Sequence, residues 1–104
     1  MDIKASRFYR TRDSLPALVR NVTIPNPQGL HARPVMKFVD IAGRFQSSIL
    51  VQKGGKSVDG KNPMEMMLLE ATQGTVLELH ADGPDAEGAL EALTRLVADG
   101  FGEM

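Results

Sequence analysis

The chain has 104 residues, enough for one hydrophobic core and too few for two, so we expect a single globular domain. Hydrophobic residues make up 42% and charged residues 24%, and no apolar run approaches the ~20 residues of a membrane-spanning helix. The absence of cysteine excludes disulfides, thiolate metal sites and a thiol nucleophile. With no apolar signal-peptide core at the N-terminus, we expect a cytoplasmic protein without a membrane partner.

The formal net charge is −1, but the charges are unevenly distributed. Residues 1–20 contain five Lys and Arg against two Asp, a balance of +3, so the remaining residues sum to −4. A basic segment can bind nucleic acid. Because these basic residues are sparse and interrupted, and the rest of the chain is acidic, we expect no nucleic-acid partner.

The first residues of the chain precede every predicted element. We divide the chain into an N-terminal extension, residues 1–16, and a folded domain, residues 17–104. In one reading the extension is a flexible basic tail. In the other its apolar side chains cover apolar positions on an open sheet face; the side chains concerned are Phe8, Tyr9, Leu15, Leu50 and Val76.

The domain begins with a strand, a helix and a hairpin. Alternating apolar residues predict a first strand over 17–24. Apolar residues at three- and four-residue spacing then predict a helix over 32–42. Two strands follow at 48–53 and 56–59, joined by a tight turn at Gly54-Gly55.

The string Asn62-Pro63-Met64-Glu65 is typical of a helix start. Asn62 can cap the helix, and Pro63 suits its first position because no N–H is needed there. We expect Glu65 to reach back to the N–H of Asn62, and the short helix to end near residue 70.

A fourth strand is predicted over 75–81, and an uninterrupted apolar stripe predicts a last helix after Asp85 that ends at Gly100. The order is therefore βαββαβα. Each helix has one apolar stripe and each strand one apolar face. This pattern favours an α+β fold in which three helices pack on one side of a four-stranded antiparallel sheet.

The string Gly29-Leu30-His31-Ala32-Arg33-Pro34 spans the start of the first predicted helix and places His31 at or near its N-cap. The backbone N–H groups of Ala32 and Arg33 then have no carbonyl partner within the helix. Together with the helix dipole and the Arg33 guanidinium they can bind an anion beside an imidazole nucleophile. The residues alone leave two readings open, a phosphoryl-bearing histidine and a histidine that only caps the helix.

The same string resembles the active-site loop of the histidine-containing phosphocarrier protein (HPr) family. The resemblance runs from about Val19 to about Gly102, through Gly54-Gly55-Lys56-Ser57-Val58 and Gln73-Gly74-Thr75. It implies an open-faced β-sandwich. It also implies that enzyme I of the phosphoenolpyruvate-dependent phosphotransferase system phosphorylates His31 on Nδ1, and that the group passes to an enzyme IIA. Such a protein is a carrier and not an autonomous catalyst.

In the HPr family the positions of Met36, Met64 and Met67 lie beside the histidine and contact enzyme I and the enzyme IIA proteins. Flexible thioether side chains suit a surface that must fit several partners in turn. We therefore expect a partner interface at these three methionines. For Met66 and Leu69 we expect packing in the core.

Asn62 departs from the family pattern. Many members have a serine at this position, which a dedicated kinase phosphorylates. Asparagine keeps the capping role but has no hydroxyl group. We expect no regulatory phosphorylation at Asn62, and Ser57 is no substitute by position.

Two alternatives to the carrier remain. In the first, the chain is a regulatory paralogue, and the phosphorylation state of His31 switches partner binding without sugar transport. In the second, it is a small-molecule sensor domain.

His80 is expected on the open sheet face, and two histidines on different elements without clustered acids do not make a metal site. We expect a monomer with no metal and no cofactor.

Overall fold

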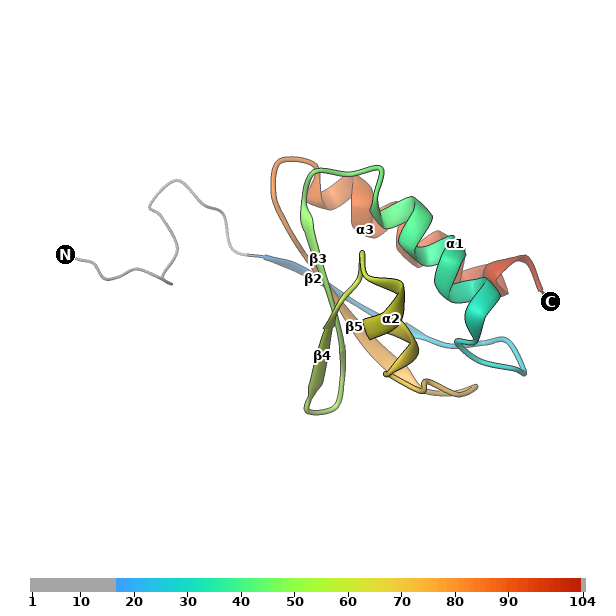
Figure 1. Ribbon diagram of the computed structural model, residues 1–104. Coiled ribbons are helices and arrows are strands. Elements are labelled where there is room, and N and C mark those ends of the chain that lie inside the picture. Colours follow the sequence, from blue (N-terminus) through green and yellow to red (C-terminus); the bar gives the residue numbers. More distant parts are fainter. Residues whose placement is uncertain (1–16, 104) are drawn as a thin grey trace.

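Four antiparallel strands form one sheet in the order β2-β5-β3-β4, so β2 and β4 are its edges (Figure 1). The structure is a computed structural model and describes residues 17–103. The strands are β2 (Leu18–Thr23), β3 (Ser48–Lys53), β4 (Lys56–Asp59) and β5 (Val76–Asp82). All four predicted strands are confirmed, β5 one residue further along the chain than expected.

Three helices cover one face of the sheet and leave the other face open (Figure 1). They are α1 (Ala32–Ala42), α2 (Pro63–Met67) and α3 (Ala86–Ala98), and a single 3-10 turn, η1 (Gly100–Gly102), follows α3. The predicted α+β fold and its βαββαβα order are confirmed. Within residues 17–103, no helix is long and apolar enough to cross a membrane.

The core lies between the sheet and the helices. Strand register pairs Val22 with Leu77 and Val51 with Leu79, which places apolar side chains on the same face of neighbouring strands. Phe38 of α1 packs into this layer. Two predicted core residues of the α2 region are confirmed; they are Met66 and Leu69, both almost fully buried.

The open face carries exposed apolar side chains, as the alternation predicted. Leu50 and Val76 are 40% and 54% exposed. The segment expected in one reading to cover them, residues 1–16 with Phe8, Tyr9 and Leu15, lies outside the described residues. Both readings of the extension therefore stay predictions.

Helix α2 is shorter than predicted, ending at Met67 instead of near residue 70. Two lysine ammonium groups donate hydrogen bonds to the backbone carbonyls just beyond this end, so these carbonyls have partners without a further helical turn. Lys53 and Lys56 donate to the carbonyl oxygens of Leu68, Leu69 and Glu70. Periodicity could not predict this end, because it depends on side chains from β3 and β4.

The start of α2 confirms one half of the expected capping pattern. The Asn62 Oδ1 accepts a hydrogen bond from the Glu65 N–H at 3.1 Å. The expected return bond is wrong: the Glu65 Oε1 accepts from the N–H of Asp59 at 2.9 Å, and the Asn62 N–H donates to the Asp59 carbonyl. The preceding turn provides a closer partner for each group.

The chain turns sharply after α3. Phe101 has a left-handed backbone, with φ of 57°, between Gly100 and Gly102, which also have positive φ. A left-handed conformation costs a residue with a side chain about 1–2 kcal/mol. Complete burial of the phenyl ring contributes roughly 1.5–3 kcal/mol and offsets that cost. The turn brings Glu103 back toward the start of α1.

Candidate functional site: a histidine pocket at the start of α1

His31 is the N-cap residue of α1, as predicted, and its extended backbone lets its carbonyl accept the first helical hydrogen bond from the Val35 N–H at 3.0 Å. Within residues 17–103, the backbone N–H groups of Ala32 and Arg33 have no hydrogen-bond partner. Pro34 has no N–H. The first turn of α1 contains no acidic side chain. The positive end of the helix dipole, beside the imidazole, is therefore not neutralised by a carboxylate of the helix itself.

The loop before His31 requires glycine at position 29. Gly29 has φ of 68°, and a Cβ atom there would lie only 2.6 Å from the carbonyl oxygen of Ala71. That oxygen accepts a hydrogen bond from the Leu30 N–H at 2.8 Å. This close approach holds the loop against residues 71–72 and so determines the position of the His31 backbone.

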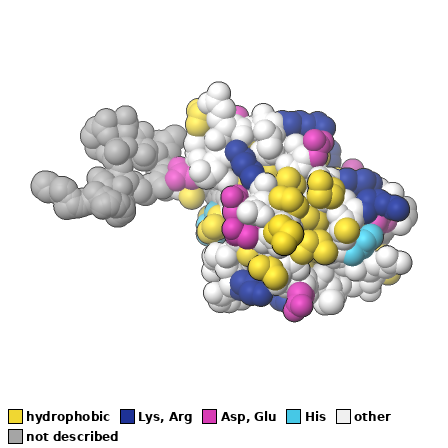
Figure 2. Space-filling view, viewed as in Figure 1, with side chains coloured by type: hydrophobic (Ala, Val, Ile, Leu, Met, Phe, Trp, Pro, Cys, Tyr) yellow, Lys and Arg dark blue, Asp and Glu magenta, His cyan; other side chains and the backbone are white. Residues whose placement is uncertain are grey.

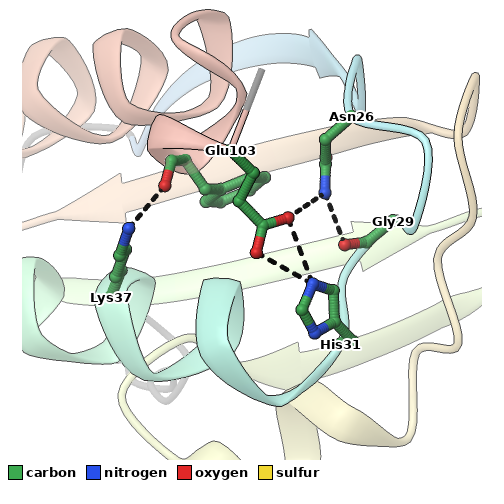
Figure 3. A network of polar contacts seen from close by, with 6 residues as sticks. Asn26, Gly29, His31, Lys37 and Glu103 are labelled. Carbon is green, nitrogen blue, oxygen red and sulfur yellow. Dashed lines mark hydrogen bonds and ion pairs between the residues drawn. The ribbon is translucent and has the colours of Figure 1, made fainter.

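A carboxylate that the sequence analysis did not single out lies against the imidazole (Figure 3). The His31 Nε2 lies 2.9 Å from Oε2 and 3.1 Å from Oε1 of Glu103. The Asn26 Nδ2 donates to Oε1 at 3.0 Å and to the Gly29 carbonyl at 2.8 Å. Asn26 is fully buried. One amide therefore joins the loop before α1 to the end of the chain.

The surroundings of Glu103 favour its ionised form. The hydrogen bond from His31 contributes most to holding the pKa of the Glu103 carboxyl below its ordinary value, and partial desolvation opposes it. The hydrogen bond from Asn26 and the electrostatic attraction of His31 and of the Arg33 guanidinium lower this pKa further. Glu103 is therefore a carboxylate near neutral pH.

Lys37 holds the turn that carries Glu103. Its Nζ donates to the carbonyl oxygen of Phe101 at 2.6 Å (Figure 3). The resulting open pocket has a volume of about 410 Å³, and its lining residues are Pro27, Gln28, His31, Arg33, Lys37, Gly102 and Glu103. Within residues 17–103 the Arg33 guanidinium forms no ion pair, so this exposed cation is available to an anion in the pocket.

Exposed apolar side chains gather on the face formed by α1 and α2, with histidine and basic side chains at their border (Figure 2). Met36, Met64 and Met67 are 56%, 77% and 43% exposed, and Leu68 is also exposed. Sequence analysis singled out the three methionines and did not name Leu68. The methionines are available for contact and do not fill the core.

His80 lies apart from this pocket, on the open face as predicted. Its Nε2 is 3.0 Å from the Glu78 Oε1 on the same strand. Asn62 caps α2 and has no hydroxyl group. Neither residue joins the pocket around His31.

Glu103, Asn26 and Lys37 form the polar contacts that hold the pocket together, and sequence analysis missed all three. Glu103 follows the last predicted helix, and Asn26 lies between two prolines in a loop, so no periodicity marks either of them. The Pro-Asn-Pro string predicts a turn and says nothing of burial. Lys37 lies on the exposed side of a helix, where basic residues are common, so its sequence position does not indicate a role in the pocket.

The fold and the pocket define a small α+β protein that can hold an anion beside an accessible histidine. The family model described as the PTS HPr component phosphorylation site matches residues 18–99. The chain belongs to the HPr family of phosphocarrier proteins. Glu103 lies beyond the residues that this family model matches.

Relatives and solved structures agree with this membership. The phosphocarrier protein HPr of Cupriavidus necator is 43% identical over 86 residues, which cover 83% of this chain and 97% of the relative. That of Pseudomonas aeruginosa is 44% identical over 90 residues, covering 86% and 98%. The crystal structure of HPr-C-His from Thermoanaerobacter tengcongensis superimposes with a TM-score of 0.81 at 42% identity, covering 84% of this chain and 98% of that chain.

Proposed function

We propose that His31 accepts a phosphoryl group from phosphorylated enzyme I of the phosphotransferase system and donates it to an enzyme IIA protein. The observation that carries this proposal is the position of His31 as the N-cap of α1, beside two backbone N–H groups that have no partner within residues 17–103. A phosphoryl group on the ring would lie at the positive end of the helix dipole.

The transfer needs a nucleophile and a site for negative charge. The lone pair of the His31 Nδ1 attacks phosphorus, a new P–N bond forms, and the bond between phosphorus and the phosphorylated group of enzyme I breaks. The electron pair of the broken bond stays on the donor atom of enzyme I. The Arg33 guanidinium and the N–H groups of Ala32 and Arg33 bind the phosphoryl oxygens through charge-assisted hydrogen bonds.

The binding must remain moderate, because a carrier gives the group away again. Helix-dipole effects contribute about 0.3–1 kcal/mol per charge. A solvent-exposed guanidinium also binds less strongly than a buried one, since water screens its charge. These magnitudes suit a phosphohistidine that is stable enough to diffuse between partners and reactive enough to transfer.

Met36, Met64 and Met67 form the docking surface in this proposal. They are exposed on the face where α1 meets α2, and α1 begins at the pocket. A thioether surface can adapt to two different partners. Enzyme I and an enzyme IIA would bind here in turn, each placing its own reacting group at the pocket.

The test is to incubate the chain with phosphoenolpyruvate and enzyme I and to measure its mass. We expect one acid-labile phosphoryl group, which His31→Ala abolishes. Absence of label, or label on another side chain, would refute the proposal. In a second step the phosphorylated protein is mixed with an enzyme IIA. If the group transfers, the carrier function holds; if it stays on His31, the regulatory alternative replaces it.

A further inference from the structure

We propose that Glu103 is a positioning residue that holds the imidazole of His31 with a proton on Nε2 and a free lone pair on Nδ1. The proposal rests on the proposed function, because it assigns Glu103 a part in phosphoryl transfer to His31. It concerns a side chain that follows the last helix and that no sequence pattern marks.

The contact with Glu103 determines which ring nitrogen carries the proton. A neutral imidazole has one N–H, and an ionised carboxylate can only accept hydrogen bonds. Since both Glu103 oxygens lie within 3.1 Å of Nε2, that nitrogen must be the donor. Within residues 17–103 Nδ1 makes no hydrogen bond, and the ring does not cap the first turn of α1. Its lone pair is therefore free for the incoming phosphorus.

The carboxylate is ionised in this position because cations and donors surround it. His31 and Asn26 donate to it, and Arg33 and Lys37 line the same pocket. The pKa of the Glu103 carboxyl is lowered by His31, Asn26 and Arg33, with the His31 hydrogen bond as the largest cause. A protonated carboxyl could accept or donate and would not select one tautomer.

Two contacts fix the direction of the carboxylate. The buried Asn26 amide donates to Glu103 and to the Gly29 carbonyl, while its own Oδ1 has no partner within the described residues. The flipped amide would place that oxygen against two other oxygens, so the orientation is determined. Lys37 holds the preceding turn through the Phe101 carbonyl.

The same arrangement favours the product of the transfer. When Nδ1 forms its bond to phosphorus, Nε2 keeps its proton and the ring becomes positively charged. No proton has to leave or move between the ring nitrogens. The Glu103 carboxylate then accepts a hydrogen bond from a charged ring, which is stronger than one from a neutral ring. Removal of the carboxylate should therefore slow the transfer.

The direct test is nitrogen NMR of the unphosphorylated full chain at slightly alkaline pH. In the wild-type protein we expect the His31 Nε2 to show the chemical shift of a protonated ring nitrogen and Nδ1 that of an unprotonated one. In Glu103→Ala the two shifts should move toward each other, because both tautomers become populated. Glu87→Ala, which removes an exposed carboxylate from α3, is the control and should leave both shifts unchanged.

The kinetic test measures the rate of phosphorylation by enzyme I. We expect Glu103→Ala and Glu103→Gln to lower this rate roughly tenfold, the smaller end of the losses known for removing the hydrogen-bond partner that orients a metal-binding histidine. His31 should remain the labelled residue. Glu87→Ala should transfer at the wild-type rate.

The outcomes separate the two proposals. If the wild-type chain takes no label, the proposed function fails. If the wild-type chain is labelled on His31, but Glu103→Ala keeps both the wild-type shifts and the wild-type rate, only the role of Glu103 is overturned. A slower rate with unchanged ring shifts also overturns it, because the carboxylate would then act without selecting the tautomer.

Discussion

Lys37 and Phe101, 64 positions apart in the chain, are joined by a hydrogen bond of 2.6 Å from the lysine Nζ to the phenylalanine carbonyl oxygen. This bond attaches the exposed side of α1 to the turn after α3. Phe101 is the residue of that turn with a left-handed backbone. Its strained conformation is therefore stabilised by the Lys37 hydrogen bond to its carbonyl and by the burial of its phenyl ring in the core.

Replacement of this lysine should loosen the C-terminal turn. We expect Lys37→Met to lower the free energy of unfolding by about 0.5–1.5 kcal/mol, the net contribution of one hydrogen bond. Urea unfolding measures the change. Arg95→Met is the matched control, because it removes an exposed cation whose ion pair with Glu91 spans 3.6 Å and should contribute less than about 0.5 kcal/mol. Equal effects of the two substitutions would contradict the role of Lys37.

Alanine substitutions at Gly29 and Gly54 should distinguish the cost of backbone strain from the cost of a steric collision. Both have positive φ, but a Cβ at Gly54 meets nothing within 4 Å, whereas one at Gly29 meets the Ala71 oxygen at 2.6 Å. We expect Gly54→Ala to destabilise the fold by about 1–2 kcal/mol from strain alone. Gly29→Ala should cost at least ~3 kcal/mol, because a collision with backbone adds to the strain. Thermal unfolding of both variants checks the difference; similar melting temperatures would refute it.

The parts of the fold that could be predicted from the sequence are those determined by local periodicity. The apolar spacing of residues 32–42 reproduces α1 residue for residue, and the hairpin through Gly54-Gly55 is equally local. The end of α2 could not be predicted, because ammonium groups from β3 and β4 satisfy its carbonyls.

The candidate site divides in the same way. His31, Ala32 and Arg33 are consecutive, so the sequence alone indicates a histidine beside a helix N-terminus. Glu103 is 72 positions from His31 and reaches it only because the turn at Phe101 reverses the chain. Contacts at such separations have no local signal, and they require the assembled sheet and helices.

Arg33 should matter for transfer and little for stability. A cation at a helix N-terminus is unfavourable by about 0.3–1 kcal/mol, while the attraction between Arg33 and Glu103 acts in the opposite direction. We therefore expect Arg33→Ala to change the free energy of unfolding by less than about 0.5 kcal/mol. The loss of a charged hydrogen bond to the phosphoryl group, about 1.5–3 kcal/mol, should slow transfer by roughly tenfold or more.

The arginine prediction is checked with enzyme I kinetics and urea unfolding on the same samples. Arg44→Ala is the control. Arg44 follows the C-terminal end of α1 and pairs with Asp40, so this variant should transfer normally. A fully active Arg33→Ala protein would show that the guanidinium does not bind the phosphoryl group.

Asp85 should make the fold sensitive to acid. The hydrogen bond from the Ser47 hydroxyl at 2.6 Å is the largest cause of its lowered pKa, followed by the Gln46 N–H. Because the folded pKa lies below the ordinary value of 3.8, the stabilising contribution is complete above that value. It is lost as the pH falls through the folded pKa. Urea unfolding from pH 7 to pH 2 should show Asp85→Asn less stable than wild type at neutral pH, with the gap closing below pH ~4. A gap that is independent of pH would contradict this assignment.

Met64 provides the sharpest test of the docking surface, because it is the most exposed of the three methionines, at 77%. We expect Met64→Gln to leave the free energy of unfolding within about 0.5 kcal/mol of wild type, since no core contact is lost. Transfer from enzyme I should show a raised KM with a nearly unchanged kcat, because the substitution weakens docking and leaves the reacting groups in place. Val76→Gln is the matched control: it also removes an exposed apolar side chain, 54% exposed, but on the open sheet face away from the helices. If Val76→Gln raised KM as much as Met64→Gln did, the effect would not be specific to the face formed by α1 and α2, and the assignment of the docking surface would fail.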